Sequence, residues 1–202
     1  MADVEFFFDL SSPWTRLAFH NIKPILAETN ASVLWRPFLV GGVFNAVNSD
    51  VYASRSNPDH PKLRAGSHWL DDWAKLAGVP MNFPSEYHPL RSVAAMRFCC
   101  VLEDSQEELE RFADHAFDAY FRLQLNLDDP SVLVTLANEI GMDGEELLAQ
   151  STTQANKDRL RANTEEAIAR GSFGSPTILV GERLYFGNDQ LPLVRMLLSG
   201  NR

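Results

Sequence analysis

Cysteine is scarce in this chain: the 202 residues include only Cys99 and Cys100, which are neighbours. Two adjacent cysteines cannot build a disulfide framework. Both lie in the segment Ser92–Leu102, which reads as a helix, and free buried cysteines usually pack like small hydrophobic side chains. The sequence therefore predicts a packing role for this pair rather than a redox role.

Basic residues are outnumbered, with 18 Lys and Arg against 27 Asp and Glu and a formal net charge of −9. Nucleic-acid-binding domains usually carry basic patches, so this balance argues against nucleic acid as the main partner. It says little against a small anionic ligand, because such a ligand responds to the charges of its own site.

Long hydrophobic runs and targeting signals are missing as well. No apolar stretch approaches the roughly 20 residues that a membrane-spanning helix needs. The start Met1-Ala2-Asp3-Val4-Glu5 lacks the basic residues that open a secretory signal. We therefore expect a cytoplasmic protein with no membrane partner.

Metal-binding patterns are also absent from the sequence. The five histidines, at positions 20, 60, 68, 88 and 115, do not have the spacing of metal ligands. We find no P-loop, dinucleotide-binding fingerprint, nucleophile elbow or zinc motif, and we expect no metal site. His60 and His68 flank a predicted loop and can face a site, although solvated or packed histidines are more common.

The most informative stretch is Phe6-Phe7-Phe8-Asp9-Leu10-Ser11-Ser12-Pro13-Trp14. Its three phenylalanines predict a buried strand. Serine is a good N-cap residue and proline suits the first position of a helix, so a helix should begin at Pro13 and run to about Thr29. Free N–H groups at such a helix start favour an anion. The alternative is that Ser12 only caps the helix.

The order of predicted elements suggests the fold. A strand at Ser32–Phe38 follows the first helix, and a long loop from Leu39 to Pro61 follows that strand. Nearly everything from position 62 to 169 then has helical patterns. The chain ends with strands at 177–180 and 183–186 and a helix at 190–198, capped by Gly187-Asn188-Asp189.

This order predicts an α/β protein with a thioredoxin-like fold, made of β-α-β and β-β-α halves with an all-helical domain inserted between them. The thioredoxin-like domain should comprise residues 1–60 and 172–202, and the helical insertion residues 61–171. Such a fold by itself does not give a function.

A thioredoxin-like fold has its active site at the start of the first helix. Redox members carry Cys-x-x-Cys there, and the helix end stabilises the thiolate. This chain has Ser11-Ser12-Pro13-Trp14 instead, which excludes thiol–disulfide exchange by the protein at this position. A serine can still donate a hydrogen bond to the thiolate of a bound small thiol.

Two further segments are expected to face that helix start. Ser175-Pro176 precedes the third strand, and a cis peptide bond there would leave the backbone of Ser175 free to pair with an extended peptide ligand. The alternative is an ordinary proline at a strand start. Asn188 and Asp189 either cap the last helix or recognise the α-amino acid end of a ligand.

The sequence resembles the kappa-class glutathione transferases and the related bacterial 2-hydroxychromene-2-carboxylate isomerases. The resemblance covers nearly the whole chain. Its motifs are Phe7-Phe8-Asp9-Leu10-Ser11-Ser12-Pro13, Arg36-Pro37 followed by Gly41-Gly42, Ala94-Ala95-Met96-Arg97, Gly171-Ser172-Phe173-Gly174-Ser175-Pro176, and Phe186-Gly187-Asn188-Asp189.

The resemblance implies glutathione as the cofactor and a homodimeric assembly. It implies that Ser12 hydrogen-bonds the glutathione sulfur and that Ser175, before Pro176, pairs with the cysteinyl part. Asn188 and Asp189 would hold the γ-glutamyl end. Lys62 would contact the glycyl carboxylate, and Asn48 would lie near the ligand.

One departure concerns the second substrate. Where many relatives carry a lysine after Gly41-Gly42-Val43-Phe44, this chain has Asn45, and Ser11 replaces a more usual bulky apolar residue. We take Ser11, Trp14 and Asn45 as candidate substrate contacts. The loss of the lysine weakens the assignment to that particular aromatic acid.

These features predict a glutathione-dependent isomerase of a conjugated aromatic acid, similar to 2-hydroxychromene-2-carboxylate isomerase. Reversible addition of the thiolate would allow a double bond to rotate. One alternative is a kappa-class transferase that conjugates glutathione to small electrophiles. A second is a module that binds glutathione without turning anything over.

Overall fold

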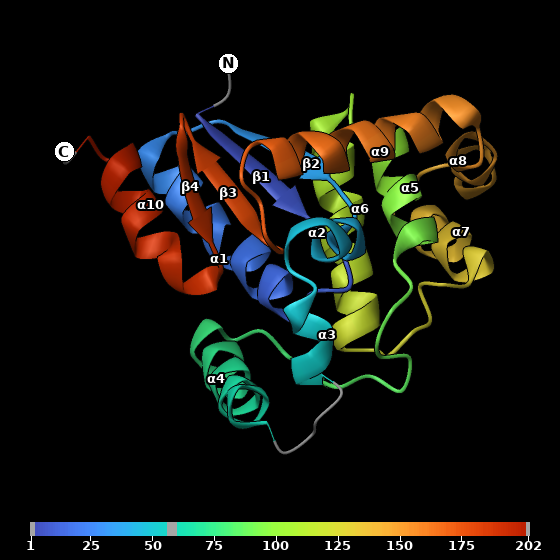
Figure 1. Ribbon diagram of the computed structural model, residues 1–202. Coiled ribbons are helices and arrows are strands. Elements are labelled where there is room, and N and C mark those ends of the chain that lie inside the picture. Colours follow the sequence, from blue (N-terminus) through green and yellow to red (C-terminus); the bar gives the residue numbers. More distant parts are fainter. Residues whose placement is uncertain (1–2, 56–59, 201–202) are drawn as a thin grey trace.

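A four-stranded sheet forms the centre of the fold, with the strand order β2-β1-β3-β4 (Figure 1). The computed structural model describes residues 3–55 and 60–200, apart from the side chains at positions 53–55 and 62. The strands are β1 (Val4–Phe8), β2 (Val33–Pro37), β3 (Thr177–Val180) and β4 (Arg183–Phe186). β1 pairs parallel with β2, and β3 pairs antiparallel with both β1 and β4. The predicted thioredoxin-like class is confirmed.

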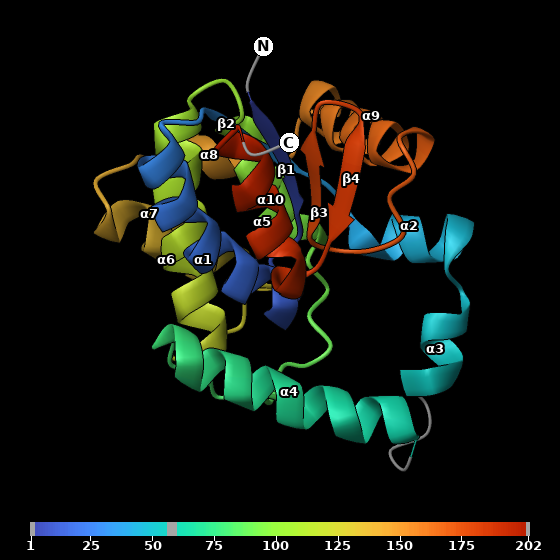
Figure 2. The ribbon, with the colours of Figure 1, turned by 90° about the vertical axis from the view of Figure 1, so that its left-hand side faces the viewer.

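Strand β1 is buried on both faces because it lies between two layers of helices. Phe6 and Phe8 point into the core beneath α1 (Pro13–Thr29) and α10 (Leu191–Leu198). Phe7 points the other way, toward α2 (Val40–Val47) and α9 (Gln154–Ala169). Figures 1 and 2 show α1 and α10 on one side of the sheet and α9 crossing the other. The alternation follows from the two-residue period of a strand.

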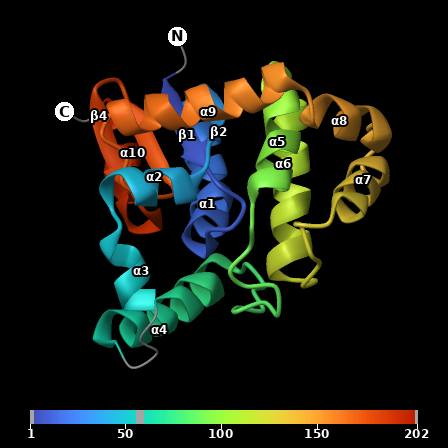
Figure 3. The ribbon, with the colours of Figure 1, turned by 45° about the vertical axis from the view of Figure 1, so that its right-hand side comes forward.

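The predicted helical segment between the two halves is confirmed. It consists of α4 (Pro61–Ala77), α5 (Val93–Val101), α6 (Gln106–Phe121), α7 (Pro130–Glu139), α8 (Gly144–Ser151) and α9. Helices α5 to α8 stand beside the β2 edge of the sheet, whereas α4 lies apart from them (Figure 3). Leu70 and Ala74 of α4, together with Val79 just after that helix, form a cluster with Leu17 of α1.

The predicted loop from Leu39 to Pro61 is wrong over most of positions 40–55. Two short helices, α2 and α3 (Asp50–Arg55), occupy that stretch. The pair Gly41-Gly42 and the many polar residues suggest a loop, yet Val40, Val43 and Phe44 recur at helical spacing and are buried against α9 and β1. Tertiary packing therefore decides the conformation here.

Helix starts agree with the sequence only in part. Asp143 caps α8, since its carboxylate accepts a hydrogen bond from the Glu146 N–H at 3.0 Å. The pattern Ser105-Gln106-Glu107-Glu108 is typical of a capping box, but Ser105 makes no side-chain cap to α6 within the described residues. The last helix begins at Leu191, after a short 3-10 turn at Asn188–Gln190, and that turn takes the place of the predicted cap.

The hydrophobic core is continuous between the sheet and the inserted helices. Phe8 of β1 and Phe19 of α1 pack with Phe117 of α6, at ring-centroid distances of 6.4 Å and 5.3 Å.

Across the described positions 3–55 and 60–200, no helix has the length and apolar character needed to cross a membrane.

Candidate functional site

Ser12 occupies the start of α1, at the carboxyl end of the central strand. Its backbone is extended, and its hydroxyl oxygen accepts a hydrogen bond from the Thr15 N–H at 3.2 Å, which makes it the N-cap. Pro13 follows at the first helical position. The predicted strand, turn and helix start are confirmed.

Ser12 also contacts the predicted second segment. Its hydroxyl donates a hydrogen bond to the Ser175 carbonyl at 3.0 Å, across 163 positions of sequence. The Ser175–Pro176 peptide bond is cis, as predicted. The Ser175 carbonyl is therefore not free, whereas the Ser175 N–H has no hydrogen-bond partner among the described residues.

The Ser175 side chain has a role that the sequence did not indicate. Its hydroxyl accepts a hydrogen bond from the Asp9 N–H at 3.1 Å and lies 2.7 Å from the Thr15 hydroxyl. These contacts join the loop before β3 to the loop after β1 and to the first turn of α1. The Trp14 N–H has no acceptor in the described part of the chain, so one backbone donor at this helix start stays open.

Asp9 is the main site residue that the sequence analysis missed. It is fully buried, and its carboxylate accepts four hydrogen bonds. One oxygen accepts from the Ser11 N–H and hydroxyl, at 2.9 Å and 2.8 Å. The other accepts from the Val40 N–H and the Ser92 hydroxyl, at 2.9 Å and 3.0 Å. One side chain thus holds the β1–α1 loop, the start of α2 and the start of α5.

Burial raises the pKa of the Asp9 carboxyl above its ordinary value, and the hydrogen bonds from Ser11, Val40 and Ser92 act in the opposite direction. All four groups that contact the carboxylate act as donors, so they stabilise its charged form. The available signal was local: an acidic residue directly after an apolar strand, with a serine two positions later, is typical of an Asx-turn.

Asn188 and Asp189 lie in a turn beside the cis proline, because the Gly187 N–H donates to the Pro176 carbonyl at 3.4 Å. Asn188 is buried, and its carbonyl oxygen accepts from the Asn21 amide of α1 at 2.8 Å. The Asn188 amide nitrogen is buried and finds no hydrogen-bond partner among the residues that are described. Asp189 is exposed and accepts from the Gln190 amide at 2.8 Å.

Asn48 and Asn45 lie at the end of α2 and make different contacts. The Asn48 amide donates to the Phe173 carbonyl at 2.9 Å, which ties α2 to the loop that leads to Ser175. Asn45 is exposed, and its side-chain oxygen accepts from the Tyr52 hydroxyl at 3.0 Å.

The remaining candidates are less closely tied to Ser12. Ser11 uses both its N–H and its hydroxyl on Asp9. Trp14 is half-buried and packs against the cluster that joins α1 to α4. Lys62 belongs to α4, but its side chain lies outside the described residues.

An aromatic pair beside Ser175 was also missed by the sequence analysis. The rings of Phe173 and Phe186 lie 4.5 Å apart, and both side chains are partly exposed, at 41% and 38%. A Cβ added at Gly174 would lie 2.6 Å from the Phe186 ring, so a larger residue there would force that ring to move. The pair supplies apolar surface next to the polar site.

Cysteines and metal ligands add nothing to this site. Cys99 and Cys100 are free and buried, and burial raises the pKa of both thiols, so the predicted packing role is confirmed. Of the residues that are described, no three His, Cys, Asp or Glu side chains are grouped in a way that would hold a metal ion.

Similarity to named proteins covers nearly the whole chain. The chain is 23% identical over 195 residues to a 2-hydroxychromene-2-carboxylate isomerase of Sphingobium xenophagum, covering 96% of this chain and 97% of that protein. It is 26% identical over 211 residues to human glutathione S-transferase kappa 1, covering 97% of this chain and 90% of that protein. The resemblance stated from the sequence motifs is therefore confirmed.

Solved structures share the fold. A 2-hydroxychromene-2-carboxylate isomerase superposes with a TM-score of 0.83 at 22% identity, over 98% of this chain and 95% of that chain. The cytosolic disulfide reductase DsbM from Pseudomonas aeruginosa with GSH superposes with a TM-score of 0.65 at 16% identity, over 98% of each chain.

A family model matches residues 3–199, a range that contains the Ser12 helix start, the cis proline and the whole inserted helical segment. The chain therefore belongs to the family of DSBA-like thioredoxin domains.

Proposed function

We propose that this protein is a glutathione-dependent isomerase of a conjugated aromatic acid, of the 2-hydroxychromene-2-carboxylate isomerase type. One observation carries the proposal: a serine hydroxyl, not a thiol, stands at the start of α1, 3.0 Å from the Ser175 carbonyl beside the cis proline. A hydroxyl there can hold the thiolate of another molecule, and the named relatives support an isomerase or a transferase.

The donor set fits glutathione, which is a thiol peptide with carboxylate ends. The unpaired N–H groups of Trp14 and Ser175 can meet peptide carbonyls or an anion. The buried Asn188 amide nitrogen lacks a partner, and a buried donor left unpaired is costly. Asp189 is exposed beside it and suits an ammonium group. Lys62 is proposed for the glycyl carboxylate, and Asn48 for the rim of the site.

Ser12 stabilises negative charge at the site. Its hydroxyl now donates to the Ser175 carbonyl, and rotation of the side chain can direct the same proton to sulfur. The partial positive charge of the helix start acts in the same direction. Each unit by which the thiol pKa falls corresponds to about 1.4 kcal/mol of stabilisation of the thiolate. When bound, glutathione would supply a thiolate that adds reversibly to a conjugated carbon of the substrate. This addition converts a double bond into a single bond that can rotate, and loss of the thiolate restores the double bond.

Asp9 positions Ser12. Its backbone carbonyl accepts from the Ser12 N–H at 3.2 Å, and its carboxylate fixes Ser11. The hydroxyl of Ser12 is thus presented from a loop with little freedom, which lowers the entropic cost of reaching the reactive geometry. Ser11 acts through Asp9 in this scheme and not on the substrate.

The substrate would lie against the apolar surface near the site. We assign Phe173 and Phe186 as contacts for the aromatic ring of the substrate. Trp14, which is less exposed than these two, is a further contact. The Asn45 side-chain oxygen is bonded to Tyr52, and its amide nitrogen, which makes no hydrogen bond to the described residues, is assigned to a polar group of the substrate.

A kappa-type glutathione transferase is the second candidate. Helix α2 carries no Lys or Arg between Val40 and Val47, so a substrate carboxylate finds no cation on that helix. The same thiolate site then serves a neutral electrophile and releases the conjugate. Similarity to human glutathione S-transferase kappa 1 supports this reading equally.

An absorbance assay with 2-hydroxychromene-2-carboxylate, run with and without glutathione, tests the proposal. Interconversion that requires glutathione and leaves its concentration unchanged is expected for the isomerase. Stoichiometric loss of glutathione with added electrophiles identifies the transferase. Glutathione binding without turnover of either substrate class contradicts both and leaves a binding module.

We also propose a cytoplasmic homodimer. Free cysteines suit a reducing compartment, in which glutathione is a thiol. Helix α4 exposes Leu63, Trp69 and Leu76, at 40%, 60% and 77%, and exposed apolar faces of this kind often mark interfaces. Light scattering after size exclusion should give twice the monomer mass of 22.7 kDa. A single-chain mass would contradict the dimer.

A further inference from the structure

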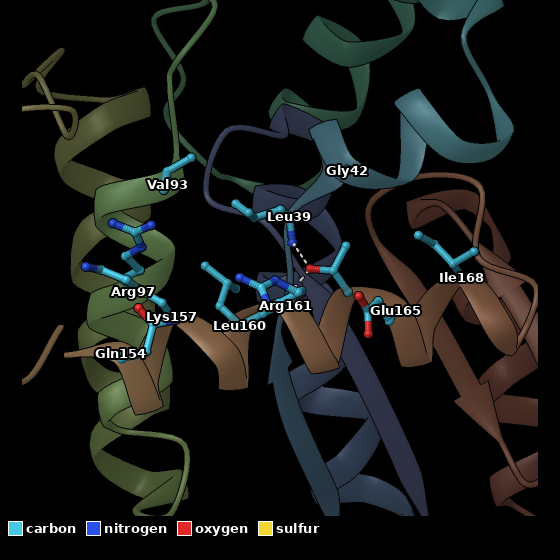
Figure 4. A pocket seen from close by; sticks show the side chains of 11 residues that line it. Leu39, Gly42, Val93, Arg97, Gln154, Lys157, Leu160, Arg161, Glu165 and Ile168 are labelled. Carbon is cyan, nitrogen blue, oxygen red and sulfur yellow. Dashed lines mark hydrogen bonds between the residues drawn. The ribbon is translucent and has the colours of Figure 1, made fainter. Parts of the chain in front are cut away.

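A cavity of about 450 Å³ lies between α2, α5 and α9. The side chains around it come from the start of α2, the first turns of α5 and one face of α9 (Figure 4). Ser12, Ser175, Asn188 and Asp189 do not line it. The cavity is therefore separate from the residues assigned to glutathione.

Positive charge gathers at one part of this cavity. Figure 4 shows Arg97 on α5 and Lys157 and Arg161 on α9 at that part, while Glu165 and Ile168 lie toward the other end of α9. Three cations thus face one acidic side chain, in a chain whose formal net charge is −9. The net charge of the side chains around the cavity is therefore positive, whereas that of the whole chain is negative.

These cations are poorly satisfied within the chain. The Nε atom of Arg97 is buried and has no hydrogen-bond partner in the part of the chain that the structure describes. Arg161 pairs with Asp158 at 3.2 Å, but both side chains are mostly exposed, at 64% and 50%, and such pairs contribute little. Among the described residues no ion pair is formed by Arg97 or Lys157. A buried guanidinium N–H without an acceptor is costly, and an anionic ligand would supply the acceptor.

The rest of the wall is apolar. Leu39, Val93 and Leu160 flank the cationic part, and Ile168 lies at the far end. A volume near 450 Å³ falls within the range of about 300 to 1,000 Å³ that is usual for small-molecule sites. The distribution of charge favours an anionic group at one end of the ligand only, since Glu165 would repel a second.

We propose that the cavity between α2, α5 and α9 binds a small organic anion, with its carboxylate at Arg97, Lys157 and Arg161 and its apolar body along Leu160 toward Ile168. This site is additional to the proposed glutathione site and does not depend on it.

A fluorescence titration with anilinonaphthalene sulfonate, an aromatic anion, provides the test. Arg97→Gln should weaken binding of this probe about tenfold, which corresponds to one charge-assisted hydrogen bond. The matched control is Arg183→Gln at the exposed start of β4, which removes the same charge elsewhere and should leave the affinity unchanged. Equal affinities for the wild type and Arg97→Gln, or equal losses in both variants, would overturn the proposal.

Further measurements locate the probe. Saturating glutathione should leave probe binding unchanged, and so should the Ser12→Ala variant. Lys157→Gln should weaken probe binding, and this variant replaces Arg97→Gln in the test if Arg97→Gln fails to fold. Arg97→Gln should also retain glutathione binding and turnover. Loss of probe binding on addition of glutathione would place the probe at Ser12 and contradict the site.

Displacement by carboxylates defines the ligand class. Naphthoate and laurate carry the same head group on an aromatic and an aliphatic body. Displacement of the probe by one of them identifies the body that the cavity accepts, and displacement by both supports a site of broad tolerance. Failure of both to compete would overturn the assignment of a carboxylate ligand.

Discussion

Asp9 and Ser12 have different roles at the proposed glutathione site. Ser12 offers a hydroxyl proton at a helix start, and Asp9 holds the loop from which that proton is presented. The sequence identified Ser12 because its neighbours are typical of a helix start. Asp9 was missed because two of its four donors come from Val40 and Ser92, which are far away in the sequence.

Replacement of Ser12 by alanine tests the residue at the centre of the proposed mechanism. Ser12→Ala should raise the pKa of the thiol of bound glutathione, because the Ser12 hydrogen bond is stronger to the thiolate than to the thiol. It should lower kcat about 100-fold and change the glutathione affinity only modestly. Ultraviolet absorbance of the thiolate against pH gives the pKa, and turnover assays give kcat.

Ser11→Ala is the matched control, since the same change is made one position away on a hydroxyl that bonds Asp9. It should leave the thiol pKa unchanged. An unchanged kcat in Ser12→Ala would count heavily against the role given to this serine.

Replacement of Asp9 by asparagine should destabilise the fold. The asparagine NH₂ group would face a donor, whichever way it is turned, because both carboxylate oxygens of Asp9 accept two hydrogen bonds. We expect a loss of about 2 kcal/mol in the free energy of unfolding, measured with urea. Asp143→Asn, at an exposed helix cap that asparagine serves equally well, should be near neutral. Equal stabilities of the Asp9 variant and the wild type would contradict this account.

The same variant should change how stability depends on pH. Burial raises the pKa of Asp9 in the folded protein above its value in the unfolded chain. Between these two values the folded protein binds more protons, so the free energy of unfolding falls as pH rises. The fall should begin at about pH 4, the ordinary carboxyl value, and Asp9→Asn should lack it. Parallel stability curves for the two proteins would show that Asp9 does not titrate in this way.

Helices α7 and α8 approach each other so closely at Gly144 that a side chain at this position has no room. A Cβ added at Gly144 would lie 2.4 Å from the Val134 carbonyl oxygen of α7. Gly144→Ala should therefore cost about 2 kcal/mol of unfolding free energy, because backbone atoms must move.

Gly66 provides the matched control for this prediction. It lies inside α4, and an added Cβ would meet no atom of the described residues within 4 Å. Gly66→Ala should stabilise the protein by up to about 1 kcal/mol through helix propensity. Thermal and urea unfolding check both variants, and a neutral Gly144→Ala would disprove the close contact.

Element prediction succeeded where one segment carries its own signal. The run Phe6 to Phe8 is a strand and Pro13 begins a helix because apolar patterning and backbone geometry act locally. Helix α2 was missed because its two glycines disfavour a helix on their own. Burial of Val43 and Phe44 against α9 and β1 stabilises it, and α9 is more than a hundred positions away.

The whole molecule should unfold as one unit, although residues 1–60 with 172–202 and residues 61–171 were predicted as separate domains. Phe8, Phe19 and Phe117 form one cluster across that boundary. Urea transitions followed by tryptophan fluorescence and by far-ultraviolet circular dichroism should coincide. Two separated transitions would support independent domains.

The sequence by itself determined the order of the four strands and of the helices other than α2 and α3, the presence of Ser12 where redox relatives have cysteine, and the absence of an excess of basic residues. These features depend on residue type and on spacing along the chain. Only the tertiary structure decided that Ser12 donates to Ser175, that the Asp9 carboxylate joins three segments, and that Arg97, Lys157 and Arg161 share one cavity. Those contacts join residues far apart in the chain, and their positions follow from packing, which local patterns do not encode.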